Sequence, residues 1–128
     1  MAEIKNNAAP RIQDRNRPET KQNAGEALTV PKGKTFSIKV SVTPGANWVD
    51  EAGYDVSWVR VYFVPDRDST AYEVGNFELA GGEGDSPVTT GQSVVFGMRI
   101  FDPGELLVMT YSLAEGLVLN HRRFEVHD

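Results

Sequence analysis

The stretch LLVMTYSLAEGLVLNHRRFEV, residues Leu106 to Val126, decides the fold of this chain. Both of its halves are rich in large apolar side chains, and a short segment containing Gly116 separates them. Such a pattern is typical of two β-strands joined by a tight turn. We therefore expect strands at Leu106–Tyr111 and Leu117–Val126, with the turn at Ser112–Gly116.

The segments before this hairpin also carry strand patterns. Apolar and polar residues alternate from Thr35 to Val42, which indicates a half-buried antiparallel strand. Asp55–Val64 has apolar residues on both faces, which predicts a strand in the interior of a sheet. Shorter runs predict strands at Ala27–Val30, Tyr72–Leu79 and Val94–Ile100. Since helical periodicity is absent, we predict an all-β fold, a small antiparallel immunoglobulin-like β-sandwich.

The first 25 residues differ from the rest in composition. They are polar and are interrupted by Pro10 and Pro18, so alone they cannot bury enough apolar surface to offset the entropy of ordering. We expect an N-terminal arm at 1–25 that is disordered or ordered on a partner, followed by the β-sandwich domain at 26–128. Arg11, Arg15 and Arg17 favour an acidic partner surface for this arm.

The overall composition excludes several classes of function. The 128 residues carry a formal charge of −5, which argues against nucleic-acid binding. Cysteine is absent, which excludes disulfides, iron–sulfur clusters, thiolate ligands and thiol nucleophiles. No apolar run reaches the about 20 residues that span a membrane, and the N-terminal residues lack the apolar core of a secretion signal. We expect a cytoplasmic protein without a membrane span.

Two segments resemble the iron domain of the superoxide reductase family, which includes neelaredoxin and the catalytic domain of desulfoferrodoxin. That family has an E-H-Y-I-x-W-I-x-L-Y strand, and this chain has GYDVSWVRVY with Trp58 and Tyr62 in register. The family's Y-C-N-x-H-G-x-W turn corresponds to YSLAEGLV, which begins at Tyr111. The family's H-P-N/M loop corresponds to TPGAN, which begins at Thr43. The resemblance covers roughly Phe36 to Val126.

The resemblance also implies where an iron site would lie. In that family four histidine nitrogens and one cysteine thiolate hold the iron. The cysteine position corresponds to Ser112, and the three histidine positions that can be aligned correspond to Glu115, Tyr54 and the neighbourhood of Pro44. A serine hydroxyl stays protonated and cannot replace the charge of a thiolate. The resemblance thus implies a degenerate site without iron or another cofactor, and no superoxide reductase activity.

Other candidate residues favour structural interpretations. His121 and His127 lie on one predicted strand, too far apart to chelate one ion, and are expected at the surface. Trp48 lies in a predicted loop and is a candidate for partner contact, whereas Trp58 is expected in the core. The Arg122-Arg123 pair is expected on a solvated face.

These observations predict a non-catalytic accessory or structural subunit of a larger complex, redox or metabolic, and not an enzyme. Its partner would be another protein or a second copy of the chain. One alternative is a sulfur-compound carrier that resembles the cysteine-free subunit of the thiosulfate-oxidation carrier. Another is an enzyme with a repurposed metal site at Glu115, Tyr54 and Asp55.

Overall fold

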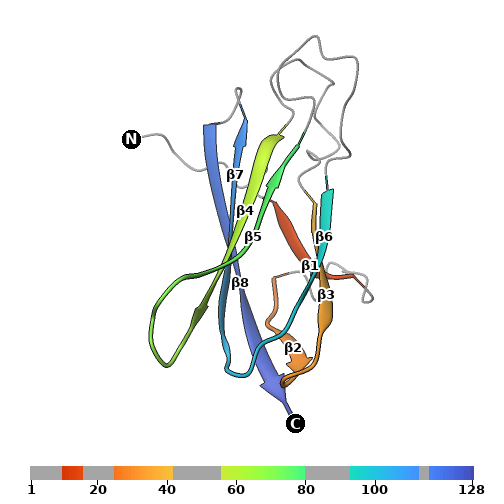
Figure 1. The fold of residues 1–128 in the computed structure, drawn as a ribbon, viewed down its shortest axis with the longest axis vertical. Coiled ribbons are helices and arrows are strands. Elements are labelled where there is room, and N and C mark those ends of the chain that lie inside the picture. The colour runs from red at the N-terminus through yellow and green to blue at the C-terminus, as the bar shows by residue number, and fades with distance from the viewer. Residues whose placement is uncertain (1–9, 16–24, 42–55, 80–92, 113–115) are drawn as a thin grey trace.

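The computed structural model contains two β-sheets that face each other (Figure 1). It describes residues 10–15, 25–41, 56–79, 93–112 and 116–128. The strands are β1 (Arg11–Asp14), β2 (Leu28–Pro31), β3 (Phe36–Ser41), β4 (Val56–Pro65), β5 (Tyr72–Glu78), β6 (Ser93–Met98), β7 (Gly104–Ser112) and β8 (Gly116–His127). The described residues contain no helix, so the predicted all-β sandwich is confirmed.

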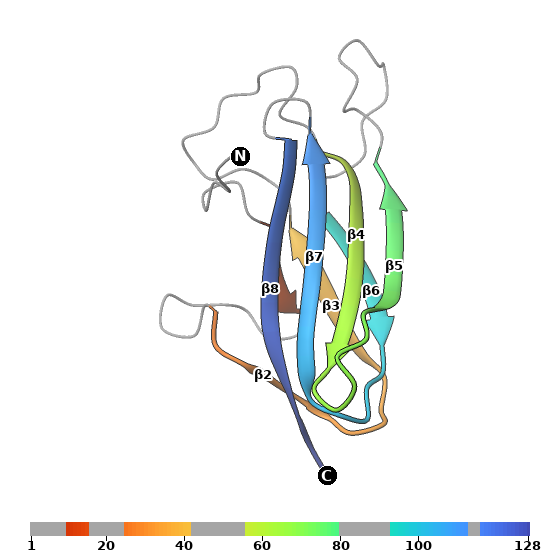
Figure 2. The same cartoon turned by 90° about the vertical axis from the view of Figure 1, so that its left-hand side faces the viewer.

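The larger sheet has the order β2-β8-β7-β4-β5 (Figure 2). Strands β7 and β8 pair antiparallel from Gly104↔Phe124 to Ser112↔Gly116, which confirms the predicted C-terminal hairpin. Strand β4 lies between β7 and β5, as its two apolar faces predict. This sheet is not purely antiparallel, because β2 pairs parallel to the end of β8 through Thr29↔Glu125 and its neighbours.

The smaller sheet has the order β1-β3-β6, and its first strand falls within the segment predicted to be an arm. Strand β1 pairs with β3 from Arg11↔Ser41 to Asp14↔Ile38. The side chain of Ile12 is buried at 3% exposure, and Pro10 is also buried. This part of 1–25 therefore belongs to the sandwich, through its backbone pairing with β3 and the buried side chain of Ile12. The remainder of the arm lies outside the described residues.

The core lies between the two sheets and follows the alternation of the strands. Phe36, Ile38 and Val40 of β3 point inward, as their period of two predicts. Phe124 of β8 is fully buried and packs against the rings of Phe36 and Phe63, at centroid distances of 5.8 and 6.4 Å. The three rings join the two sheets.

The expectation that Trp58 lies in the core is wrong. An irregularity in the pairing between Val56 and Trp58 leaves Val59 and Val61 on the inner face and Trp58 half-buried on the outer face. There its ring stacks on Tyr111 at 6.0 Å, and the guanidinium of Arg60 lies 4.2 Å from the indole centroid. The bulge, which local alternation does not reveal, moves the indole to the other side of the sheet.

Candidate functional site

Ser112, at the position that the resemblance assigns to a cysteine, ends strand β7. Its Cα partners are Val56, the first residue of β4, and Gly116, the first residue of β8. Its side chain is buried at 4% exposure and shares the inner face of β7 with Thr110. The fold therefore brings the ends of three strands together around an inward-pointing hydroxyl. We call this region the turn end.

Most other predicted site positions lie outside the described residues. These positions are Pro44, Trp48, Tyr54, Asp55, Glu115 and Arg17. Of the arm arginines, Arg11 and Arg15 are exposed at either end of β1, and the Arg15 backbone N–H donates to the carbonyl of Ser37 at 3.0 Å. Their expected role in partner contact stays a prediction.

The two histidines lie apart on the surface of β8. His121 Nδ1 lies 3.2 Å from Glu105 Oε2, and the His127 ring contacts the carbonyl of Asp128. Within the described ranges no three side chains of histidine, cysteine, aspartate or glutamate gather as a metal site would require. With two histidines and no cysteine in the sequence, the residues present do not fit an iron centre of four imidazoles and one thiolate.

Arg122 is buried, which corrects the expectation that the Arg122-Arg123 pair is solvated. The residue is 6% exposed and lies on the inner face of β8. Nε donates to the carbonyl of Glu26 at 2.8 Å, and one terminal nitrogen donates to the carbonyl of Ile12. A buried guanidinium is tolerated when its donors are satisfied, and here those hydrogen bonds hold β1 and the entry to β2 against β8.

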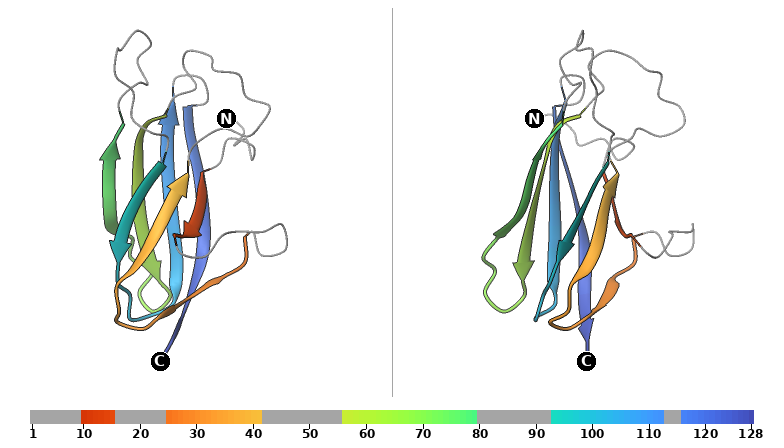
Figure 3. Two further views of the ribbon diagram at one scale, coloured as in Figure 1. Left: turned by 90° about the vertical axis from the view of Figure 1, so that its right-hand side faces the viewer. Right: turned by 45° about the vertical axis from the view of Figure 1, so that its right-hand side comes forward.

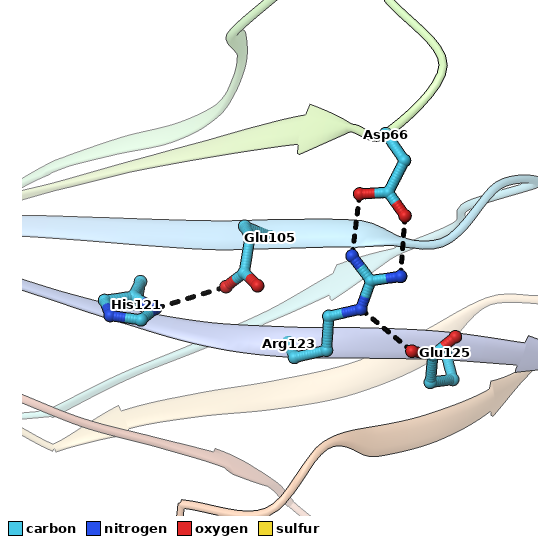
Figure 4. A network of polar contacts seen from close by, with 5 residues as sticks. All are labelled: Asp66, Glu105, His121, Arg123 and Glu125. Atoms are coloured by element: carbon cyan, nitrogen blue, oxygen red, sulfur yellow. Dashed lines mark hydrogen bonds and ion pairs between the residues drawn. The ribbon is translucent and has the colours of Figure 1, made fainter. Parts of the chain in front are cut away.

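Arg123 points outward and joins the β4–β5 connection to β8 (Figure 4). Both of its terminal nitrogens donate to the Asp66 carboxylate at 2.6 Å, and its Nε donates to Glu125 at 2.8 Å. The two-pronged hydrogen bond to Arg123 lowers the pKa of Asp66 below its ordinary value. The same hydrogen bonds to Asp66 and Glu125 raise the pKa of Arg123.

A cavity of about 640 Å³ lies at the other end of the sandwich, where the sequence suggested no site. Its lining comes from three connections, β2–β3, β4–β5 and β6–β7, and from the adjoining parts of β4, β5 and β6. Figure 3 shows the three connections at the same end of the molecule. Each connection contributes one cation, Lys32, Arg67 and Arg99 in turn. We call this region the pocket end. Sequence patterns could not reveal it, because its residues are far apart in the chain.

Comparison with known proteins identifies relatives of the chain. No family model matches the sequence. It is 32% identical over 88 residues to neelaredoxin from Megalodesulfovibrio gigas, a match that covers 64% of this chain and 68% of that protein. A putative superoxide reductase from Thermotoga maritima has a TM-score of 0.73 at 23% identity, covering 99% of this chain and 95% of that one. A superoxide reductase from Ignicoccus hospitalis has a TM-score of 0.64 at 21% identity, covering 93% and 80%.

These relatives contradict the prediction of a non-catalytic accessory or structural subunit. Neelaredoxin and the superoxide reductases of similar fold are enzymes. The prediction that this chain is not an enzyme therefore has no support among its relatives. That prediction relied on ligand positions read from short motifs, whereas the match to neelaredoxin extends over 88 residues. The structural likeness, at lower identity, independently supports the fold. On these grounds the chain belongs to the neelaredoxin family of superoxide reductases.

Proposed function

We propose that this chain is an enzyme that acts on superoxide, the substrate in the names of its relatives. The observation that carries the proposal is the identity of 32% to neelaredoxin, over 68% of that protein. Reduction of superoxide adds one electron and two protons and gives hydrogen peroxide. The electron would come from a reduced one-electron carrier.

We also propose that the family's thiolate-ligated iron is lost in this member, so that the reaction takes place at a different centre. The donor set supports this, since the chain contains no cysteine and its two histidines lie apart on β8. The resemblance assigns Ser112 to the position of the thiolate, and its hydroxyl would not supply the thiolate's charge, because an alcohol stays protonated at neutral pH.

The test is the rate of superoxide loss together with the yield of hydrogen peroxide. Protein incubated without oxygen with Fe²⁺, with Mn²⁺ or with no metal is desalted and mixed with superoxide in the presence of ascorbate. Reduction produces one peroxide for each superoxide consumed, whereas dismutation produces one for every two. In at least one preparation we expect superoxide to disappear faster than it does spontaneously, with one hydrogen peroxide formed for each superoxide consumed. Loss at the spontaneous rate in all three would contradict the proposed activity.

The proposed loss of the thiolate-ligated iron has a separate test. After incubation with Fe²⁺, desalting and oxidation, we expect the visible spectrum to lack a charge-transfer band of the kind that thiolate-bound iron produces. A Ser112→Cys variant treated in the same way should also lack the band, because the imidazoles are still missing. Stoichiometric iron with such a band in the variant would show that the remaining ligands are present.

As partner we propose a second copy of this chain. An apolar strip on the outer face of the larger sheet supports this, since Leu117 and Leu119 are 58% and 41% exposed. The strip continues through Tyr111, the Cα partner of Leu117, to the half-buried Trp58. Light scattering after size exclusion should give a dimer or larger mass, which Leu119→Lys should reduce. A monomeric wild-type protein would contradict the proposed self-association.

A further inference from the structure

The cavity at the pocket end has walls that the backbone holds in place. The N–H of Gly33 donates to the carbonyl of Ile100 at 2.8 Å, which joins the β2–β3 turn to the β6–β7 connection. The N–H of Asp66 donates to the carbonyl of Pro103 at 3.0 Å, which joins the β4–β5 connection to the same segment. Arg67 adds an ion pair with Asp102 at 3.4 Å. The cavity is therefore preformed, as small-molecule sites usually are.

The charge of this cavity differs in sign from that of the chain. Its lining contains three cations and one carboxylate, although the chain as a whole carries a formal charge of −5. Asp102 pairs with Arg67, and no carboxylate among the described residues pairs with Lys32 or Arg99. The nearby Asp66 and Asp68 are engaged elsewhere, by Arg123 and by Thr70 and Tyr72. Two cations are thus available to an anion.

Aromatic rings stand beside these cations. Phe101 is 55% exposed and Tyr72 is 50% exposed, so both ring surfaces are open to a ligand. The Arg99 guanidinium lies 5.7 Å from the Phe101 ring, and the buried Phe63 forms part of the apolar lining. A volume of about 640 Å³ is within the range of drug-sized ligands. The apolar surface suits a flat ring, and the cations suit its acidic group.

We propose that the pocket end binds a small organic anion that consists of an aromatic ring carrying a phosphate or carboxylate. Lys32 and Arg99 would neutralise the acidic group, and Phe101 and Tyr72 would contact the ring. Phosphate and carboxylate oxygens accept strong hydrogen bonds from guanidinium and ammonium groups. Contact between the ligand ring and the exposed protein rings is favourable, because it buries apolar surface on both. The site is separate from the turn end, and the proposal does not depend on the proposed reaction with superoxide.

The test is calorimetric titration with 1-naphthyl phosphate, compared with 1-naphthoate, inorganic phosphate and neutral 1-naphthol. We expect saturable one-site binding of the two aromatic anions, weaker binding of phosphate and naphthol, and weaker binding at high salt. The double variant Lys32→Gln/Arg99→Gln should weaken binding by about tenfold or more. Phe101→Ala should also weaken it, while Arg11→Gln, an exposed charge change on β1, should leave it unchanged.

Several outcomes would overturn the proposal. These are the absence of saturable binding by either aromatic anion, equal affinity for inorganic phosphate, and an equal loss of affinity in Arg11→Gln. Because the substituted side chains are exposed, the variants should keep the wild-type urea midpoint, which confirms that each is folded during the titration. A folded double variant with wild-type affinity would likewise exclude Lys32 and Arg99 as the anion site.

Discussion

The two ends of the sandwich differ in what their side chains offer. At the turn end the strands converge on the buried Ser112, at the position that the sequence resemblance assigns to a cysteine. At the pocket end three connections each contribute one cation, Lys32, Arg67 or Arg99, to a pocket that also contains exposed aromatic rings. The two ends are separated by the length of β7, Gly104–Ser112, which spans about 26 Å at a rise of about 3.3 Å per residue. The same strands thus hold a buried hydroxyl at one end and an exposed, cationic pocket at the other.

The largest expected effect comes from the core that supports both ends. Phe124→Ala should lower the free energy of unfolding by about 4 kcal/mol, because it empties a fully buried site between two other rings. Urea unfolding followed by tryptophan fluorescence measures it. His121→Ala, on the outer face of the same strand, is the control and should change little, because its side chain is exposed. Similar losses in the two variants would contradict the assignment of the core.

A matched pair of glycines compares the two ends directly. Gly116 has φ +70° with open space where a Cβ would lie, so Gly116→Ala should cost about 1 kcal/mol from backbone strain. Gly33 has φ +72°, but its Cβ would lie 3.0 Å from the Phe101 ring, so Gly33→Ala should cost about 2 kcal/mol.

Urea midpoints measure the loss of stability in both variants, and titration with 1-naphthyl phosphate measures any change in their ligand affinity. Gly33→Ala should also weaken binding, since the added methyl displaces Phe101, whereas Gly116→Ala should not. If the two substitutions had the same effect on stability and on binding, the Phe101 ring would not pack against Gly33.

The next effect is smaller and concerns the turn end alone. Ser112→Cys should change the free energy of unfolding by less than about 1.5 kcal/mol, because the thiol replaces a hydroxyl of similar shape in a buried position. The urea midpoint and the far-ultraviolet circular dichroism spectrum measure it. Ser112→Leu is the contrasting variant and should be clearly destabilising. An unaffected Ser112→Leu would mean that this position is not enclosed.

The smallest effect is a dependence on pH at the pocket end. The pKa of Asp66 is lowered by its hydrogen bonds to Arg123, so the pair contributes stability above the ordinary aspartate pKa of about 3.9. That contribution is lost as the pH falls through the lowered pKa of the folded state. Removing the pair with Arg123→Gln should therefore reduce stability at neutral pH and have less effect in acid.

Urea midpoints of the wild type and of Arg123→Gln across the acidic range measure this difference. A control is Arg11→Gln, whose effect should not follow the titration of Asp66. A stability difference between wild type and Arg123→Gln that grows as the pH falls would have the wrong sign and would contradict the pairing.

Local sequence patterns were sufficient for most of the strands. Alternation in β3, two apolar faces in β4 and the glycine that opens β8 each report directly on backbone conformation. They do not report which strands become neighbours. The parallel pairing of β2 with β8 was therefore missed, as was β1, whose attachment depends on Ile12 and on a carbonyl that accepts from the distant Arg122.

The candidate sites were harder to predict for the same reason. The resemblance located Ser112 because the turn motif is continuous in the sequence. The pocket end could not be located, since Lys32, Arg67 and Arg99 come from three connections and meet only after the sheets have formed. Trp58 shows a further limit, because one irregular pairing between Val56 and Trp58 decides its face. Chemistry that depends on long-range register is invisible to local periodicity.

The central claim is that the two ends act separately, and backbone amide NMR during titration with 1-naphthyl phosphate tests it most directly. We expect saturable shifts at Lys32, Arg67 and Arg99–Asp102, with Thr110, Ser112 and Val118 unmoved. Shifts that centre on Ser112 and its neighbours, or that spread equally over both ends, would contradict the claim.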